Sequence, residues 1–302
     1  MKIKNIFSIC LIATVVAITV SSCEQDDPME KEQYIKQISL VGAQQSNEGH
    51  TVFDLSCKDD TYSQAYVSVA ISGTLRPDQD VTVTLTDDVP GAIDEYNRIF
   101  LSPTEVQNRQ LPESAYQIPN YSTIIKAGEA YARLPINIQT TSLECDSIYA
   151  LPFRIKSVSK YDYRKVDTIL IMALNLVNEY SHSYRWDAYR STVHSDGTLT
   201  DSVPTGQLLN LKAVSEKSMR FLGEGVEDKK TNIANYGVTL TVKEDNTLSV
   251  AAWNSSKLTV KNGSGHYDPK LKTFYVQWNY IRDGVEYQVG GTMVSQKGQL
   301  QN

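Results

Sequence analysis

AYVSVAISG (65–73) and DVTVTLTDD (80–88) decide the fold class of this 302-residue chain. In both segments apolar and polar residues alternate strictly, which is typical of half-buried β-strands. The apolar residues that share one face of each segment are Val67, Val69 and Ile71, then Val81, Val83 and Leu85. Gly73 and the Pro77-Asp78 pair lie between the two segments and predict a hairpin there.

Further short strands are expected on both sides of this pair. In the first half of the chain they cover 34–42, 50–57, 111–119, 122–139, 149–159 and 167–178, with a turn at 126–129 inside the fourth. About seven alternating strands at this spacing predict an immunoglobulin-like β-sandwich over 34–178. Ser102, Pro103 and Glu105 form a capping-box pattern and predict a short helix at that point.

The second half of the chain, 179–302, also reads as β-structure. Strands are expected at 180–192, 207–214, 218–223, 236–245, 247–254, 257–263 and 273–294. A turn is expected at 195–197, and Asp283-Gly284 predicts a hairpin in the last segment. The sequence therefore predicts an all-β protein, with a second antiparallel β-sandwich or barrel domain after the immunoglobulin-like one.

The N-terminus carries a basic start, an apolar run (6–20) and then Cys23 after two serines. The run is shorter than the ~20 residues that a membrane-spanning helix needs. The pattern resembles a bacterial lipoprotein signal, with 1–22 as signal peptide and Cys23 as the acylated first residue. Multiple acyl chains give stable membrane anchoring. The segment 23–33 is expected to be a flexible tether.

The acidic cluster EQDD (24–27) follows Cys23 directly. It resembles the tag that sends Bacteroidota lipoproteins to the outer cell surface. A solvated spacer is the alternative interpretation. The expected location is thus the outer membrane, with the protein lipid-anchored and facing the cell exterior.

Four short sequence motifs occur in a characteristic order: DEYN (94–97), LPESAYQI (111–118), IKAGE (125–129) and YALPFRIKSV (149–158). This order resembles the N-terminal β-sandwich of Bacteroidota surface lipoproteins, a domain of unknown function. In some relatives that module precedes a family-18 endoglycosidase domain, and in others a smaller all-β domain. The second half, including GHYDPKLKTFYVQWNY (265–280), resembles the smaller domain. The resemblance implies a place in a polysaccharide-utilisation system.

Several function classes are excluded by composition. The formal net charge is −6, and removing 1–22 with its two lysines leaves about −8, without a basic stripe that would indicate nucleic acid. The four histidines and the cysteines show no zinc spacing, so neither a metal nor another cofactor is expected. Cys57 and Cys145 remain as one disulfide or two free thiols.

No catalytic constellation is evident. A TIM barrel needs roughly 250 residues, so no glycosidase barrel fits after the first domain. Neither a family-18 acid motif nor a G-x-S-x-G elbow occurs. Glu224, Glu227 and Asp228 are interpreted as an acidic loop on a solvated face. We therefore expect a protein that is not an enzyme; a glycoside hydrolase is the less favoured alternative.

Glycan binding is the favoured function, because sugars stack their C–H faces on aromatic rings. Trp278 shares a strand face with apolar residues and is assigned to the core. The candidate binding residues are Trp186 with Tyr184, Arg185, Asp187 and Tyr189, and Trp253 with Asn254. Packing between the domains is the alternative role for Trp186. The expected ligand is a poly- or oligosaccharide.

A structural or assembly role is the alternative of a different class. In it the chain is an accessory lipoprotein that packs against an outer-membrane glycan transporter through an apolar or β-edge patch. Three Asp-Ser/Thr-aliphatic triplets also resemble O-glycosylation acceptors of this bacterial group, although such short patterns also arise by chance. Their acceptor residues are Ser147, Thr168 and Ser202.

Overall fold

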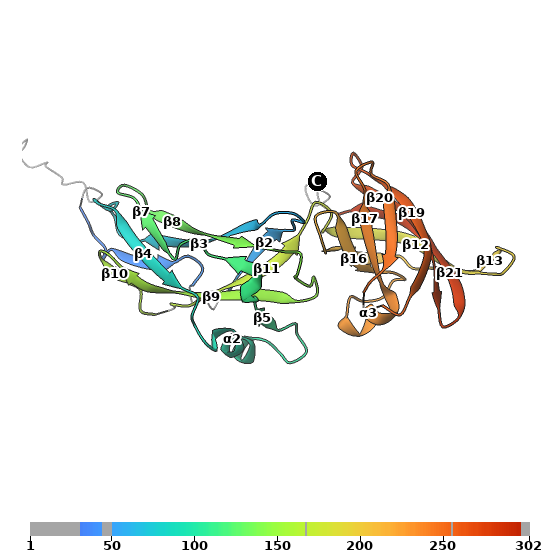
Figure 1. Ribbon diagram of the computed structural model, residues 1–302, viewed down its shortest axis with the longest axis horizontal. Helices are drawn as coiled ribbons and strands as arrows, with labels where there is room; N and C mark the ends of the chain where they lie inside the picture. The colour runs from blue at the N-terminus through green and yellow to red at the C-terminus, as the bar shows by residue number, and fades with distance from the viewer. Residues whose placement is uncertain (1–30, 44–49, 167, 255, 297–302) are drawn as a thin grey trace, which may run out of the picture.

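The computed structural model describes residues 31–43, 50–166, 168–254 and 256–296, and shows two β-rich domains placed end to end (Figure 1). The predicted all-β fold class is confirmed. Cys23, the acidic cluster after it and the signal segment lie outside the described residues. In the described part of the chain, no helix has the length and apolar character that crossing a membrane requires.

The first domain is a sandwich of two sheets. One sheet has the order β10 (Asp162–Tyr163), β1 (Gln37–Leu40), β3 (Ser63–Ile71), β8 (Tyr131–Ile138) and β6 (Tyr116–Gln117). The other has the order β2 (His50–Ser56), β11 (Leu170–Val177), β9 (Ile148–Val158), β4 (Val81–Thr86) and β7 (Ser122–Ile125), and β5 (Asn108–Gln110) pairs with β9. The pairs β1–β10, β2–β11 and β5–β9 are parallel, and the other pairs are antiparallel.

The core of this domain lies between the two sheets, where the alternation of β3 and β4 places their valines. Val67, Val69, Val81 and Val83 have no exposed surface. Burying a Val or Leu side chain fully contributes about 1.5–3 kcal/mol, so these positions account for much of the stability of the sandwich. The polar residues between them point to solvent, as the alternation requires.

The predicted hairpin between 65–73 and 80–88 is wrong. β3 pairs with β1 and β8, whereas β4 pairs with β7 and β9, so the two strands belong to opposite sheets. Gly73 does provide a turn, with φ of 120°, but the chain after it runs along a mostly exposed loop to the other sheet. The turn at 126–129 likewise joins β7 of one sheet to β8 of the other.

The predicted helix at Ser102–Glu105 is also wrong, since the helix of this region, α2, spans Ala92–Phe100. The capping contacts nevertheless form: the Ser102 amide donates to Glu105 Oε2 at 2.6 Å, and the Thr104 amide donates to Ser102 Oγ at 3.3 Å. They close a single turn directly after α2. A capping box favours a turn, and a helix needs a continuing apolar face.

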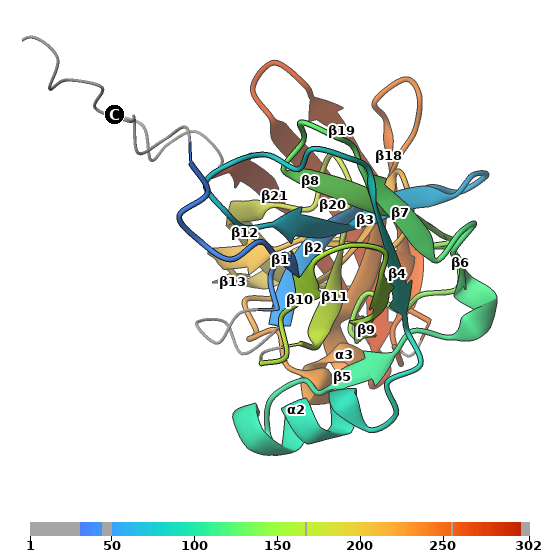
Figure 2. The same cartoon turned by 90° about the vertical axis from the view of Figure 1, so that its left-hand side faces the viewer.

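The second domain has two antiparallel sheets. The larger has the order β13 (Leu199–Pro204), β12 (Ser183–Val193), β21 (Val285–Ser295), β20 (Thr273–Arg282) and β19 (Thr259–Asp268), and β14 (Gln207–Asn210) pairs with β12. The smaller has the order β15 (Lys212–Ala213), β16 (Ser218–Leu222), β17 (Gly237–Val242) and β18 (Leu248–Ala252). A short helix, α3 (Lys230–Tyr236), joins β16 to β17, and both views place α2 and α3 on the same side of the molecule (Figures 1 and 2).

The predicted hairpin at Asp283-Gly284 is confirmed. Both residues have positive φ, 51° and 78°, and β20 pairs with β21 on either side of them. Two successive left-handed residues are the geometry of a type I′ turn, which Asp-Gly favours. The turn at 195–197 is confirmed as well: it joins β12 to β13, with Gly197 at φ of 82°.

Candidate functional site

The two domains meet at a short link, 178–182, between β11 and β12. Asn178 fixes this link to the second domain, because its side-chain amide donates to the carbonyls of Ser215 at 2.8 Å and Ser218 at 3.0 Å. Side-chain bonds to backbone carbonyls at both ends of a turn restrict its motion. These hydrogen bonds therefore hold the link in one orientation relative to the second domain.

An ion-pair cluster crosses the junction. Arg220 of β16 has no exposed surface; its Nη1 lies 2.7 Å from Asp228, and its Nη2 contacts Asp146 of the first domain. Lys212 Nζ lies 2.8 Å from Asp146 and 3.4 Å from Asp228. Burial alone would lower the pKa of Arg220, but the two carboxylates outweigh it and raise the pKa above its ordinary value. The buried guanidinium stays charged and joins the domains.

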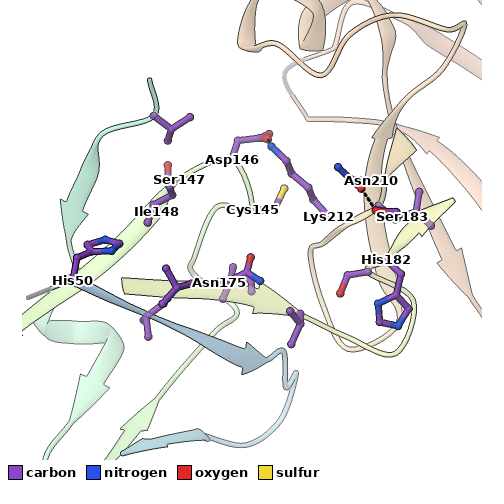
Figure 3. A pocket seen from close by; sticks show the side chains of 17 residues that line it. His50, Cys145, Asp146, Ser147, Ile148, Asn175, His182, Ser183, Asn210 and Lys212 are labelled. Atoms are coloured by element: carbon purple, nitrogen blue, oxygen red, sulfur yellow. Dashed lines mark hydrogen bonds and ion pairs between the residues drawn. The ribbon is translucent and has the colours of Figure 1, made fainter. Parts of the chain in front are cut away.

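A cleft of about 480 Å³ opens beside this cluster, with walls from both domains (Figure 3). Its polar wall residues include His50 and Asn175 of the first domain and Ser183 and Asn210 of the second. Exposed aliphatic side chains complete the first domain's wall: Val52 (59% exposed), Val106 (54%) and Ile148 (36%). The cleft thus combines apolar surface with a few convergent polar groups, which is typical of small-molecule sites.

The polar side chains of the cleft are held in place by neighbours. Asn175 Nδ2 donates to Asp54 Oδ1 at 2.7 Å, and the Ser183 hydroxyl donates to Asn210 Oδ1. In the described part of the chain, no protein group bonds to the side-chain oxygen Oδ1 of Asn175 or to the side-chain nitrogen Nδ2 of Asn210. One acceptor and one donor therefore remain for a ligand.

His50, at the first domain's end of the cleft, is oriented by two contacts. Its ring stacks on Tyr96 of α2 with the centroids 4.6 Å apart, and its Nε2 lies 3.3 Å from Asn108 Oδ1. Asn108 is in turn bonded to Asn97 of α2. The helix that the sequence did not predict thus positions one wall of the cleft.

Cys57 and Cys145 are free thiols of the first domain, and Cys145 lines the cleft. Burial raises the pKa of Cys57 to about 11, with further contributions from Asp59 and Cys145. Burial, followed by the charge of Asp146, raises the pKa of Cys145 to about 11 as well. Both sulfurs are therefore neutral at physiological pH, and a neutral thiol is a poor nucleophile.

The expectation that Trp186 and Tyr184 offer their rings to a sugar is contradicted. Trp186 has no exposed surface and Tyr184 is 1% exposed. Trp186 stacks on Trp278 with the ring centroids 6.1 Å apart, in the core of the second domain and not between the domains. Trp278 lies in that core, as predicted.

The other candidate binding residues do not form one site. Arg185, Asp187 and Tyr189 share the outward face of β12, where Arg185 pairs with Asp187 at 2.9 Å and Tyr189 is 60% exposed. Trp253, half-buried, and Asn254, exposed, follow β18 in the opposite sheet. None of these residues lines the cleft.

The interpretation of 224–228 as a solvated acidic loop is wrong for Glu224. Its side chain is only 7% exposed, and its carboxylate contacts the Tyr280 hydroxyl and lies 2.8 Å from Arg282 and 3.1 Å from Arg190. Glu227, at 69% exposed, fits the interpretation. Among the described residues, no cluster of three His, Cys, Asp or Glu could hold a metal ion.

The three O-glycosylation candidates lie in different surroundings. Ser147 is half-buried in the cleft wall, where its hydroxyl donates to Glu144 and accepts from Arg109, and the Asp146 beside it belongs to the ion-pair cluster. Ser202 is exposed on β13 and accepts a bond from the Ser191 hydroxyl at 3.2 Å. Thr168 is half-buried, and Asp167 before it lies outside the described residues. Their modification remains a prediction.

Reasoning from the sequence missed the cleft residues Asn175 and Asn210. Asn175 is the one polar residue of β11, within ALNLVN (173–178), and Asn210 is the exposed last residue of β14, within QLLNLK (207–212), a strand that also carries the amide of Gln207. That signal marks a polar position but does not say that the two amides face each other. Only the packing of the domains brings them to one cleft.

Comparisons with known proteins agree with the two-domain architecture. Residues 29–162 match a family model described as an N-terminal domain, and residues 168–294 match one described as a C-terminal domain. No curated protein matches the chain.

Solved structures share the fold over most of their length. A Bacteroides ovatus protein of unknown function is 20% identical, with a TM-score of 0.61, covering 86% of this chain and 94% of its own. A multidomain protein from the same species, which includes a domain of unknown function, is 19% identical with a TM-score of 0.60, covering 86% and 94%. An auxiliary nutrient binding protein from Bacteroides thetaiotaomicron is 18% identical with a TM-score of 0.57, covering 83% and 92%. The chain therefore shares the two-domain fold of these structures, and its halves match an N-terminal and a C-terminal family model.

Proposed function

We propose that this chain is a non-catalytic, surface-displayed lipoprotein that binds saccharides for a polysaccharide-utilisation system. The observation that carries the proposal is the cleft between the domains, which sets amide, hydroxyl and imidazole groups beside exposed aliphatic side chains. Saccharides need both kinds of surface, because each ring carries hydroxyls around its edge and C–H groups on its faces. Asn175 and Asn210 would bond the hydroxyls, and Val52 and Ile148 would contact the C–H groups.

The ion pairs that engage the carboxylates of Asp146 and Glu224 support binding without catalysis. Glycoside hydrolysis uses two carboxyl groups on either side of the scissile bond. In the cleft, Asp146 is engaged with Arg220 and Lys212. Glu224, elsewhere, is enclosed by two arginines and a tyrosine hydroxyl. Both carboxylates are thus occupied by basic side chains, and only Asp146 of the two lines the cleft.

The similarity in fold to the auxiliary nutrient binding protein of Bacteroides thetaiotaomicron supports the same kind of role. A shared fold is only an analogy for function, so the argument rests on the cleft. Poly- and oligosaccharides are the nutrients whose chemistry suits its wall groups.

The proposed anchor is an acylated Cys23 in the outer membrane, with the chain facing the cell exterior. The first described residues lie at the end of the first domain that is remote from the second domain (Figure 1). A tether starting there would hold the cleft away from the membrane, where a long glycan can reach it. Changing Cys23 to Ala should abolish the incorporation of radiolabelled fatty acid into the protein; labelling that persists in the variant would contradict acylation at this residue.

The proposed binding is tested by affinity electrophoresis of the mature chain without its acylated Cys23, residues 24–302, in gels that contain host or dietary polysaccharides. We expect retardation on at least one polysaccharide and its loss in the double variant Asn175→Ala/Asn210→Ala. Asn254→Ala is the matched control, because Asn254 is an exposed amide outside the cleft. No retardation on any polysaccharide, or equal retardation of all three proteins, would contradict the proposal.

A second candidate is the accessory role beside an outer-membrane transporter. It is favoured by exposed apolar side chains around α2: Ile99 (52% exposed), Phe100 (42%) and Val106 (54%). Isolated exposed residues are ordinary, but a group on one helix is typical of a protein contact. Recovery of a transporter with the wild-type protein, and its loss with Ile99→Ser/Phe100→Ser, would favour this role over saccharide binding.

A further inference from the structure

A row of three exposed side chains crosses β3 and β8 on the outer face of the first domain. Tyr66 of β3 is 38% exposed and Tyr131 of β8 is 52% exposed. The guanidinium of Arg133 lies between them, with its Cζ 5.9 Å from the centroid of Tyr66 and 5.8 Å from that of Tyr131. Cation–π contact at this distance holds the three groups in one arrangement.

The strands beneath keep this row flat and rigid. Arg133 pairs with Ser68 and Tyr131 pairs with Ala70, so small side chains flank the row on β3. The alternate residues of β3, among them Val67 and Val69, are fully buried in the core. From the level of Tyr66 to that of Tyr131 the row extends over four residues, or about 13 Å along the strands. Several linked sugar rings fit such a surface better than one.

Two amide side chains continue the row beyond Tyr66. Gln64 Oε1 accepts a bond from the Tyr66 hydroxyl at 2.7 Å, and Gln64 Nε2 lies 3.5 Å from Asn137 Oδ1. Gln64 and Asn137 are directly opposite each other in the register of the two strands. Amides beside aromatic rings supply hydrogen bonds at the edge of a stacking surface.

Arg133 has no carboxylate partner among the described residues, whereas most other arginines there are paired. It is also the one charged residue among the outward positions of β3 and β8, which are otherwise Gln64, Tyr66, Ser68, Ala70, Tyr131, Pro135 and Asn137. The Debye length is about 8 Å at physiological ionic strength, so the net negative charge elsewhere is largely screened at this row. Within these two strands the outward charge is thus a single positive group between two rings.

We propose that this Tyr66–Arg133–Tyr131 row is a second saccharide site, distinct from the cleft, and that its ligand is an acidic polysaccharide. The tyrosine rings take the C–H faces of successive sugar units, and the guanidinium takes a uronate carboxylate or a sulfate in charge-assisted hydrogen bonds. Gln64 and Asn137 bond hydroxyls of the next unit. The inference rests on the proposed saccharide binding and specifies a ligand class for a surface that the cleft does not include.

Affinity electrophoresis with paired ligands tests the inference. The acidic probes are polygalacturonate, alginate and chondroitin sulfate, and the neutral ones are fully methyl-esterified polygalacturonate and dextran. We expect retardation of the mature chain on at least one acidic probe, and roughly tenfold weaker binding for Arg133→Gln, which is the loss of one charge-assisted hydrogen bond. Tyr66→Ala/Tyr131→Ala should weaken binding similarly, and added salt should weaken the wild type more than Arg133→Gln.

Arg185→Gln and Tyr189→Ala are matched controls, because both residues are exposed on the second domain and far from the row in the sequence. Unchanged thermal unfolding of all variants shows that only the surface differs. Binding to an acidic probe that survives the row variants would overturn the inference, as would failure of every acidic probe. If a neutral glycan alone binds and the cleft variants abolish that binding, the proposed function stands and the row has no such role.

Discussion

Successive residues of β12 point to opposite faces, and this alternation decides which aromatic side chains a ligand can reach. Tyr184 and Trp186 point into the core, whereas Arg185, Asp187 and Tyr189 point to solvent. The sequence contained this information, since the same alternation assigned Trp278 to the core correctly. Treating YRWDAY (184–189) as one exposed cluster ignored it. Most of the exposed aromatic side chains are tyrosines instead, among them Tyr66 and Tyr131.

Trp186→Phe tests the core role of this residue. The smaller ring leaves a cavity beside Trp278, so we expect the free energy of unfolding to fall by about 2 kcal/mol in urea titrations. Trp253→Phe is the matched control, and because Trp253 is half-buried it should cost less than about 1 kcal/mol. Saccharide binding should be the same in both variants. Weaker binding by Trp186→Phe at unchanged stability would restore a ligand-binding role for this ring.

The thiols of Cys57 and Cys145 make a prediction about pH. Their pKa is raised to about 11 in the folded protein from an ordinary 9.0, so the folded chain keeps protons that the unfolded chain loses. The stabilisation by neutral thiols is therefore complete below pH 9.0 and is lost as pH rises toward about 11. Alkylation of the native chain by iodoacetamide should accelerate with a midpoint near pH 11, and near 9.0 in concentrated urea. The same midpoint in both conditions would contradict the raised pKa.

At the scale of the elements, strand positions were predictable and strand partners were not. The segments 65–73 and 80–88 are strands, but they face each other across the core because nothing in an alternating pattern specifies its neighbour. Asp283-Gly284 did specify a partner, since its two left-handed residues allow only a tight hairpin. Helix α2 was missed although Ala92, Ile93, Tyr96, Ile99 and Phe100 follow a helical spacing, because it spans only 9 residues and no capping side chain marks its start.

The centre of the larger sheet in the second domain offers a matched pair of glycines. A Cβ on Gly291 would lie 2.2 Å from the carbonyl oxygen of Asp187 and 2.6 Å from Ala188 Cα, so β12 and β21 would have to separate. A Cβ on the adjacent Gly290 would lie no closer than 3.4 Å to any neighbour, which is an ordinary contact. We expect Gly291→Ala to destabilise by about 3 kcal/mol in chemical denaturation.

Gly290→Ala is the control for that substitution and should be neutral, or stabilising by up to about 1 kcal/mol, because it restricts the unfolded chain without a clash. Equal stability of the two variants would mean that β12 does not approach β21 as closely as the register requires. The comparison isolates a steric effect, since both variants add the same methyl group to the same strand.

At the scale of the whole molecule, the cleft depends on how the domains pack, which composition and alternation do not encode. Asn175 and Asn210 belong to different domains and line one cleft only because the domains meet at the junction at 178–182. The junction is specified by charges far apart in the sequence: Asp146 in a loop of the first domain, and Arg220 and Lys212 in the second. Each of these residues alone is an ordinary charged side chain, so nothing in the sequence indicates that they pair.

Asp146→Asn should loosen this junction. It leaves Arg220 with one carboxylate, Asp228, and Lys212 with a 3.4 Å contact to the same group. Removing one partner of a buried ion pair is strongly destabilising, and because Arg220 keeps Asp228 we expect a loss of about 2 kcal/mol. The effect should also reach the cleft: proteolysis at 178–182 should accelerate, and saccharide binding that depends on Asn175 and Asn210 should weaken although neither residue has changed.

Asp187→Asn is the matched control, since Asp187 pairs with Arg185 on the exposed face of β12 at 2.9 Å. Exposed pairs contribute about 0–1 kcal/mol, so this variant should resemble the wild type in unfolding, proteolysis and binding. If Asp146→Asn lowers stability but leaves proteolysis of the link and saccharide binding unchanged, the charge cluster stabilises the second domain without setting the cleft. If stability, proteolysis of the link and saccharide binding change together, the buried guanidinium of Arg220 holds the two walls of the cleft at their distance.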